Sequence, residues 1–260
     1  MTPDAVALVD ALVAARRTHQ ALAPWPTLVA PEEPVAFAIQ HACGVALGEW
    51  AADDLPRHWK CGGASRTARL SHSPLLPSGV RQGDAGRPAD LRDLRWFSPG
   101  VEAEIALRLA RPVTADEALG LRAEDAAGLV DALAVAIEVV DSRWRDDPAL
   151  APTLKTADMQ VHGAFVHGPW QPWAAGRHWA AQRGTLQRDD DAPVAFAGSH
   201  PLGDPAWLLP AWLRHLSRNG ATVPAGTVVT TGTWTLPCAL RRGQRVCVRF
   251  EGLGSAALLA

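Results

Sequence analysis

The chain has 260 residues, of which 48% are hydrophobic and 20% are charged, so it can bury a sizeable core. A formal net charge of −2, and the lack of any uninterrupted apolar run near ~18 residues, argue against nucleic-acid and membrane partners. The four cysteines are scattered and form no C-x-x-C pair, which predicts a reduced, cytoplasmic chain rather than a disulfide framework or a zinc site.

Two helices are predicted at the N-terminus. The first covers residues 3 to 22, because Thr2 can cap it, Pro3 suits its first turn and apolar residues recur on one face (Val6, Val9, Leu12 and Val13). The second runs from about residue 34 to residue 50 and has Glu32 and Glu33 near its positive end.

The central part of the chain alternates between strand-like and irregular segments. Residues 57–66 (RHWKCGGASR) predict a strand that leads into a loop, and residues 71–98 predict an extended loop with a possible short strand or hairpin. Residues 100–107 predict a strand, residues 114–133 have helical spacing, and residues 134–144 (AVAIEVVDSRW) predict a buried strand.

The C-terminal part is mainly β-like. A helix is predicted to begin at Asp204 and Pro205 and to end at Asn219 and Gly220, and the segments 226–235 and 244–254 are rich in β-forming residues. Helices dominate the first half and strands the second, without regular alternation. The sequence therefore predicts an α+β fold rather than a doubly wound sheet.

The segment GVEAEIAL, residues 100–107, places two glutamates on one face of its strand. Side chains alternate along a strand, so Glu102 and Glu104 point the same way. Two carboxylates within about 4–6 Å repel each other unless a cation neutralises them. Carboxylate oxygens are the ligands that Mg²⁺ prefers. A solvated strand face is the alternative for an isolated E-x-E pair.

A third acidic residue is available in the segment AIEVVDSRW. Glu138 and Asp141 are three positions apart and so point to opposite faces of a regular strand, and only one of them is expected to join the pair. Asp141 can instead cap a turn with Arg143 as its ionic partner. The choice between the two acids stays open at this point.

Lys60 is one of only two lysines and is a candidate acid/base group or carboxylate anchor, with an ordinary partly exposed lysine as the alternative. The histidines build no convincing site, and we interpret them as surface residues or as core residues with satisfied hydrogen bonds. The tryptophans between residues 170 and 179 favour packing over a ligand cage.

Five segments occur in an order that resembles the fumarylacetoacetate hydrolase superfamily, in particular its 2-keto-4-pentenoate hydratase and 4-oxalocrotonate decarboxylase branch. They are WKCGGAS, GVEAEIAL, AIEVVDSRW, TADMQVHGAFVHG and VPAGTVVTTGTWT with the following GQRVCVRFEGLGS. The resemblance implies a mixed β-roll. It divides the chain into an N-terminal helical part, residues 1–55, and a catalytic β-roll domain, residues 56–260.

The resemblance also implies a site. A divalent metal, Mg²⁺ or Mn²⁺, would be held by Glu102, Glu104 and Glu138, which leaves Asp141 in a structural role. Lys60 would be the catalytic proton shuttle. The implied substrate contacts are Ser65, Asp158 and Thr233.

The implied substrate is a small 2-oxo acid, which can chelate a cation that stabilises the enolate. The preferred reaction is hydration of a 2-hydroxy-2,4-dienoate in the catabolism of aromatic compounds, by a homo-oligomer. The alternatives are decarboxylation, hydrolysis of a carbon–carbon bond, or a non-catalytic homologue with a degenerate site. The sequence departs from the branch pattern at residues 62–65, 73–86 and 157–161, where an amide and a hydroxyl are lost.

Overall fold

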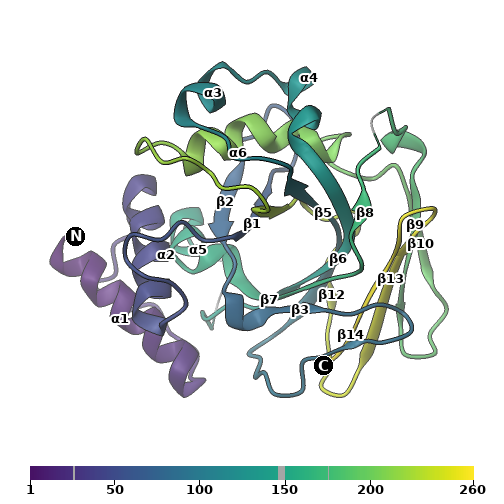
Figure 1. Cartoon of the computed structure of the whole chain (residues 1–260). Coiled ribbons are helices and arrows are strands. Elements are labelled where there is room, and N and C mark those ends of the chain that lie inside the picture. The colour runs from purple at the N-terminus through teal and green to yellow at the C-terminus, as the bar shows by residue number, and fades with distance from the viewer. Residues whose placement is uncertain (26, 146–149, 175) are drawn as a thin grey trace.

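Two β-sheets form the body of the protein (Figure 1). The computed structural model describes residues 1–25, 27–145, 150–174 and 176–260. The larger sheet has the strand order β2-β1-β11-β5-β6-β7-β3, with β12 paired to β5 and β8 paired to β6. Its strands are β1 (His58–Gly62), β2 (Ser71–Pro74), β3 (Val80–Gln82), β5 (Gly100–Leu109), β6 (Val130–Val140), β7 (His162–His167), β8 (Gln171–Pro172), β11 (Val228–Thr230) and β12 (Cys238–Ala239).

The smaller sheet has the order β10-β9-β13-β14-β4, and its strands β13 and β14 pack against β6 of the larger sheet. Its strands are β4 (Ala89–Asp90), β9 (Arg183–Arg188), β10 (Val194–Ala197), β13 (Arg245–Phe250) and β14 (Gly254–Leu259). Apolar side chains between the two sheets form the main core. The structure therefore confirms the predicted α+β class with a mixed β-roll.

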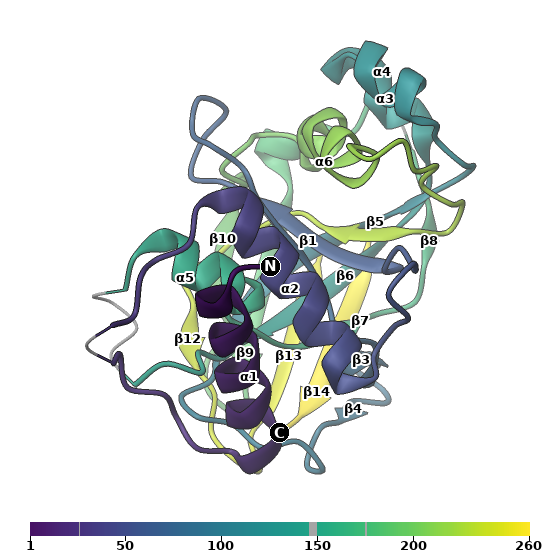
Figure 2. The ribbon, with the colours of Figure 1, turned by 90° about the vertical axis from the view of Figure 1, so that its left-hand side faces the viewer.

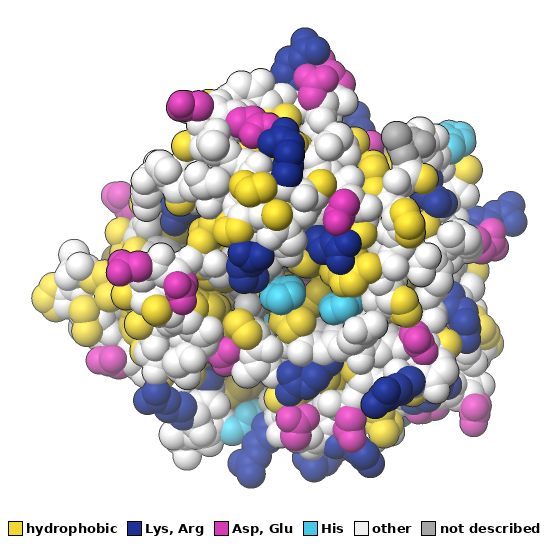
Figure 3. Space-filling model, viewed as in Figure 1, with side chains coloured by type: hydrophobic (Ala, Val, Ile, Leu, Met, Phe, Trp, Pro, Cys, Tyr) yellow, Lys and Arg dark blue, Asp and Glu magenta, His cyan; other side chains and the backbone are white. Residues whose placement is uncertain are grey.

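Helices cover two regions of the larger sheet. In Figure 2 the helices α1 (Pro3–Thr18), α2 (Glu33–Leu47) and α5 (Pro152–Ala157) lie together on one side. The helices α3 (Ala115–Gly120), α4 (Ala123–Ala126) and α6 (Leu209–Leu216) group at another end. Among the described residues, no helix has both the length and the apolarity needed to cross a membrane. On the face shown in Figure 3, acidic and basic side chains are interspersed.

The N-terminal helices follow from local sequence signals. The Thr2 hydroxyl accepts a hydrogen bond from the Ala5 backbone N–H at 3.3 Å, as an N-cap does. Of the predicted apolar face, Val9, Leu12 and Val13 are buried, but Val6 is 43% exposed and the prediction was wrong for it. The buried face of α1 also includes Ala5, Leu8 and Ala15, and Val6 lies outside it. The second helix ends at Leu47 because Gly48 takes the left-handed conformation (φ 80°).

Two predicted segments differ from the structure. Residues 71–98 contain three short strands, β2, β3 and β4, rather than an extended loop with one short strand or hairpin. Residues 114–133 form two short helices and then the start of β6. The last residues of this segment have helical spacing, but β6 pairs with β5 over the whole length of β5, and this pairing outweighs that spacing. The predicted boundary between residues 55 and 56 stays a prediction. The N-terminal helices share a core with residues beyond it (Leu76, Trp144, Leu154, Ala157 and Met159).

Candidate metal centre and active site

Three carboxylates meet on the larger sheet. Glu102 and Glu104 lie on the same face of β5, as alternation predicted, and Glu102 is paired in register with Glu138 on β6. One carboxylate oxygen from each of the three residues lies within 4.8 Å of the other two. Glu104 and Glu138 are buried and Glu102 is half-buried. The strand pairing thus brings together the acidic triad that the sequence analysis singled out.

Hydrogen bonds from the end of β11 fix Glu104. The Thr230 hydroxyl and the Gly232 backbone N–H both donate to its Oε2 atom, the second at 3.0 Å. Gly232 adopts a φ of 99°, which favours glycine, and this lets its N–H turn back toward β5. The carboxylate of Glu104 is therefore held by donors that lie 126 and 128 residues further along the chain.

Lys60 faces the same triad from β1. Its Nζ atom lies 2.5 Å from Glu138 Oε1 and donates to the Gln160 carbonyl oxygen at 3.1 Å. The parallel pairing of β1 with β11, in which Lys60 is opposite Thr230, places the ammonium group beside the carboxylates. The lysine is thus held between an acidic side chain and a backbone carbonyl.

Burial and mutual repulsion dominate the electrostatics of the triad. Burial, and next the charge of Glu138, raise the pKa of Glu102 to about 7 and the pKa of Glu104 to about 8. Burial also raises the pKa of Glu138, and Lys60 opposes that shift. For Lys60 itself, burial lowers the pKa but the three glutamates together raise it above its usual value. Without a cation, the triad therefore retains protons near neutral pH.

A cavity of about 300 Å³ opens over this group. Lys60, Glu102, Glu104, Gln160 and Thr233 are among the residues that line it. Of the three predicted substrate contacts, the structure therefore brings only Thr233 to the cavity wall.

Ser65 and Asp158 lie elsewhere. The Ser65 hydroxyl accepts a hydrogen bond from the Ala68 backbone N–H at 3.1 Å, within its own loop. Asp158 is buried and forms an ion pair with Arg143, whose Nε lies 2.6 Å from its Oδ1 atom. The structure gives neither residue a direct place in the cavity.

Asp141 turns away from the triad at the end of β6. Its carboxylate accepts hydrogen bonds from the backbone N–H groups of Phe97, at 3.0 Å, and Ser98, at 2.7 Å. The expected pairing of Asp141 with Arg143 is not formed, because Arg143 binds Asp158 instead. Glu138, and not Asp141, is thus the third acid beside Glu102 and Glu104.

Two neighbours of the triad were not found from the sequence. His162 is fully buried, its Nδ1 atom lies 3.5 Å from Glu138 Oε1, and both its ring nitrogens lack a hydrogen-bond partner among the described residues. The interpretation of the histidines as surface or satisfied core residues was wrong for His162. Gln160 acts through its main-chain carbonyl, which no side-chain pattern can reveal.

The donor set fits a hard divalent cation. Three carboxylates supply the oxygen ligands that Mg²⁺ and Mn²⁺ accept, and no thiolate competes within the group. The Glu138 Oε2 atom is buried and has no hydrogen-bond partner among the described residues. A buried, unpaired carboxylate oxygen is costly, and a cation would satisfy it. Glu102, Glu104 and Glu138 are the residues that could hold the ion.

The two sheets and the acidic triad define a class of protein. Comparison with known families identifies that class. A family model described as "Fumarylacetoacetate (FAA) hydrolase C-terminal" matches residues 87–258. The chain belongs to this family.

Within the family, the chain is similar to two kinds of curated enzyme. It is 35% identical to a 2-keto-4-pentenoate hydratase of Burkholderia vietnamiensis over 175 residues, which cover 65% of this chain and 63% of the relative. It is 32% identical to a 4-oxalocrotonate decarboxylase of Pseudomonas sp over 165 residues, which cover 62% of this chain and 60% of the relative. The matches thus span less than two thirds of these relatives.

One solved structure has the same fold over the whole chain. It is a 4-oxalocrotonate decarboxylase from Pseudomonas putida G7 complexed with magnesium and adipate, with a TM-score of 0.79. The superposition covers 100% of this chain and 98% of the other, at 20% sequence identity. At this identity the likeness establishes the fold.

Proposed function

We propose that the chain is a lyase that depends on a divalent cation and acts on a 2-oxo acid or its enol. The preferred reaction is the hydration of a 2-hydroxy-2,4-dienoate. The observation that carries the proposal is the convergence of Glu102, Glu104 and Glu138 beside Lys60, at a cavity that Lys60, Glu102 and Glu104 help to line. The 35% identity to a hydratase supports hydration as the reaction.

Mg²⁺ or Mn²⁺ is the proposed cofactor, and the magnesium in the structure of the decarboxylase relative supports it. A cation on the triad would draw electrons from the oxygens of a 2-oxo acid and so favour loss or gain of a proton at the neighbouring carbon.

The chain's own residues supply the proton transfers. Lys60 faces the cavity with its ammonium fixed by Glu138 and Gln160, so it can deliver a proton to a substrate atom in a defined direction. Thr233 lines the same cavity and is the proposed substrate contact. We assign Asp158 an indirect part, since it holds Arg143, which in turn donates to the His162 carbonyl at 2.8 Å. Ser65 remains a proposed substrate contact, and its hydroxyl accepts a hydrogen bond within its own loop in this structure.

Decarboxylation is the second candidate. It is supported by the 32% identity to a 4-oxalocrotonate decarboxylase and by the fold that the whole chain shares with another one. The same triad and lysine would serve both reactions, and the difference lies in the groups around the far end of the substrate. Hydrolysis of a carbon–carbon bond and a degenerate, non-catalytic site are the remaining alternatives.

The test combines cation binding with product analysis. Mg²⁺ is expected to raise the melting temperature of the wild type and not that of Glu102→Gln, which removes one ligand charge. The wild type with Mg²⁺ is then incubated with 2-hydroxypenta-2,4-dienoate or with 4-oxalocrotonate, and the products are followed by NMR. Hydration of the dienoate supports the preferred reaction, and CO₂ release from 4-oxalocrotonate supports the second. Cation binding without turnover of either compound indicates a degenerate site.

Three further properties belong to this proposal. We propose a homo-oligomer in the cytoplasm that takes part in the catabolism of aromatic compounds. All four cysteines are free, which fits a reducing compartment. Light scattering on the purified protein tests the oligomeric state, and growth of a deletion strain on aromatic carbon sources tests the pathway.

A further inference from the structure

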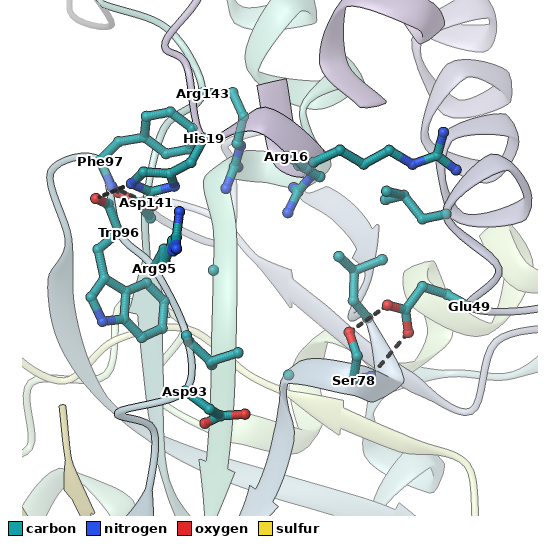
Figure 4. A pocket seen from close by; sticks show the side chains of 16 residues that line it. Arg16, His19, Glu49, Ser78, Asp93, Arg95, Trp96, Phe97, Asp141 and Arg143 are labelled. Carbon is teal, nitrogen blue, oxygen red and sulfur yellow. Dashed lines mark hydrogen bonds between the residues drawn. The ribbon is translucent and has the colours of Figure 1, made fainter. Parts of the chain in front are cut away.

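A second cavity, of about 540 Å³, lies beside the N-terminal helices (Figure 4). It shares no lining residue with the cavity over the acidic triad. Its walls come from α1, from the end of α2, from residues 76–79 and 93–97, and from the chain after β6. No step of the proposed reaction uses it.

Guanidinium groups from three separate segments reach this cavity. They belong to Arg16 and Arg17 on α1, to Arg95 and to Arg143, and Figure 4 labels all of these except Arg17. Arg17 donates to the Ala46 carbonyl oxygen. Arg143 is buried and engaged with Asp158. Arg16 uses only its Nη2 atom, which donates to the His162 carbonyl at 3.2 Å and lies 3.5 Å from Asp158. Among the described residues, Arg95 has neither a hydrogen bond nor an ion pair.

The acidic groups around the cavity have other partners. Asp141 is held by two backbone N–H groups. Glu49, on the opposite wall, accepts hydrogen bonds from the backbone and the hydroxyl of Ser78. Asp93 pairs with Arg81 at 3.5 Å. Asp158, which is buried behind the wall, is shared by two arginines. The donors of Arg95, and the Nε and Nη1 atoms of Arg16, are therefore left for a ligand.

The lining of the cavity carries more positive than negative groups, because four arginines face the carboxylates of Glu49, Asp93 and Asp141. Asp158, behind the wall, pairs with Arg16 and Arg143. Burial, and next the charge of Arg143, lower the pKa of Arg16 to about 10. Crowding of cations in a poorly hydrated place costs free energy that a bound anion would offset. The remaining walls are partly apolar, with Leu47, Leu76 and Phe97 among them.

We propose that this cavity is a binding site for a small organic dianion, whose acidic groups lie between Arg16, Arg95 and Arg143. Guanidinium groups bind carboxylates through paired N–H donors, and this geometry gives specificity as well as affinity. The volume exceeds what an inorganic ion fills, and the apolar walls fit a short carbon chain between the acidic groups.

The proposal is tested with succinate as the probe, on the full-length protein without added metal. Binding is followed by calorimetry and by the melting temperature, at constant ionic strength maintained with NaCl. We expect saturable binding of succinate, no binding of the neutral analogue succinamide, and at least a ten-fold loss of affinity in Arg95→Gln. Arg95 is exposed and makes no internal bond among the described residues, so this variant is expected to fold.

Two matched variants locate the bound anion. Arg242→Gln removes the same charge from an exposed loop and is expected to bind succinate like the wild type. Lys60→Met removes the cation of the other cavity and is also expected to leave the affinity unchanged. The proposal is overturned if succinate binding does not saturate, if Arg95→Gln binds as the wild type does, or if the affinity follows Lys60 instead.

Discussion

At the scale of single residues, Glu138 shows what side-chain patterns can and cannot predict. The alternation of side chains in GVEAEIAL predicted that Glu102 and Glu104 share a face of their strand. Glu138 and Asp141 were predicted to point to opposite faces, so that only one of them would join the pair. The contacts that hold Glu138 in place were not predictable. Lys60 reaches it across 78 residues of sequence, and that contact exists only because the sheet brings β1 near β6.

The buried histidines allow a matched test at this scale. Among the described residues, neither ring nitrogen of His162 has a hydrogen-bond partner. His200 is also buried, but its Nε2 atom bonds to the Thr231 carbonyl and its Nδ1 atom accepts from the Leu202 N–H. We expect His162→Leu to raise the free energy of unfolding of the cation-free protein by about 1 kcal/mol, because it removes an unpaired buried polar group. We expect His200→Leu to lower it by about 1–3 kcal/mol. Urea unfolding measures both, and equal losses in the two variants would contradict the prediction.

The glutamate triad predicts a pH dependence of stability. The pKa of Glu104 is about 8 in the folded, cation-free protein and 4.5 for an unperturbed glutamate, so between these values the folded state holds a proton that the unfolded state has released. The free energy of unfolding should therefore fall by about 1–2 kcal/mol as the pH rises from 6 to 8. Saturating Mg²⁺ should abolish the fall, and Glu104→Gln should reduce it. Urea unfolding at both pH values checks this, and a rise in stability over this range would refute it.

At the scale of elements, the strands and helices with strong local signals were predicted best. The N-cap of α1, the Asp204 cap before α6 and the apolar runs of β5 and β6 all stand where the sequence indicated. The short strands β2, β3 and β4 were missed because each owes its existence to a partner strand elsewhere in the chain. A segment of two to four residues is too short to show a sequence pattern that predicts such pairing.

The turn after α5 is the least predictable element. Met159, Gln160 and Val161 have φ values of 53°, 50° and 57°, a left-handed run that non-glycine residues rarely adopt. The turn presents the Gln160 carbonyl to Lys60. The surrounding core, in which Ala157 and Met159 are buried, outweighs its conformational cost.

This turn yields a stability prediction. Asparagine adopts the left-handed conformation more readily than a β-branched residue does, so Val161→Asn should raise the free energy of unfolding by about 1 kcal/mol. The same replacement at Val194, which is 57% exposed on β10 and has no positive φ, should give no gain. Chemical unfolding of the two variants tests the idea. A loss of stability in Val161→Asn would mean that the valine side chain matters more than the backbone strain.

At the scale of the whole molecule, the sequence predicted the fold class but not how the helical part joins the sheets. That junction includes an aromatic stack. The rings of His72 on β2 and His215 on α6 have centroids 4.5 Å apart, and Phe37 on α2 lies 4.3 Å from His215. The three residues are scattered along the chain, so no local pattern could predict their contact.

The stack should weaken in acid. Burial, and next Arg218, lower the pKa of His72 from 6.5 to about 4, so the unfolded state takes up a proton before the folded state does. Stability contributed by neutral His72 is thus present above about pH 6.5 and is lost as the pH falls toward 4. His72→Phe should reduce the loss of unfolding free energy between pH 7 and pH 5 by about 2 kcal/mol relative to the wild type. Identical pH profiles of the two proteins, measured by urea unfolding, would exclude this role.

The donors that hold Glu104 have a consequence for synthesis of the chain on the ribosome. All three glutamates have been translated once residue 138 is added, but the hydroxyl of Thr230 and the N–H of Gly232 follow about 90 residues later. Until they emerge, Glu104 lacks the bonds that fix its carboxylate, and β1 lacks its neighbour β11. A nascent chain stalled before residue 230 should therefore carry the acidic residues without a formed site. Cation binding would then report that translation has passed β11 and the Gly232 turn that follows it.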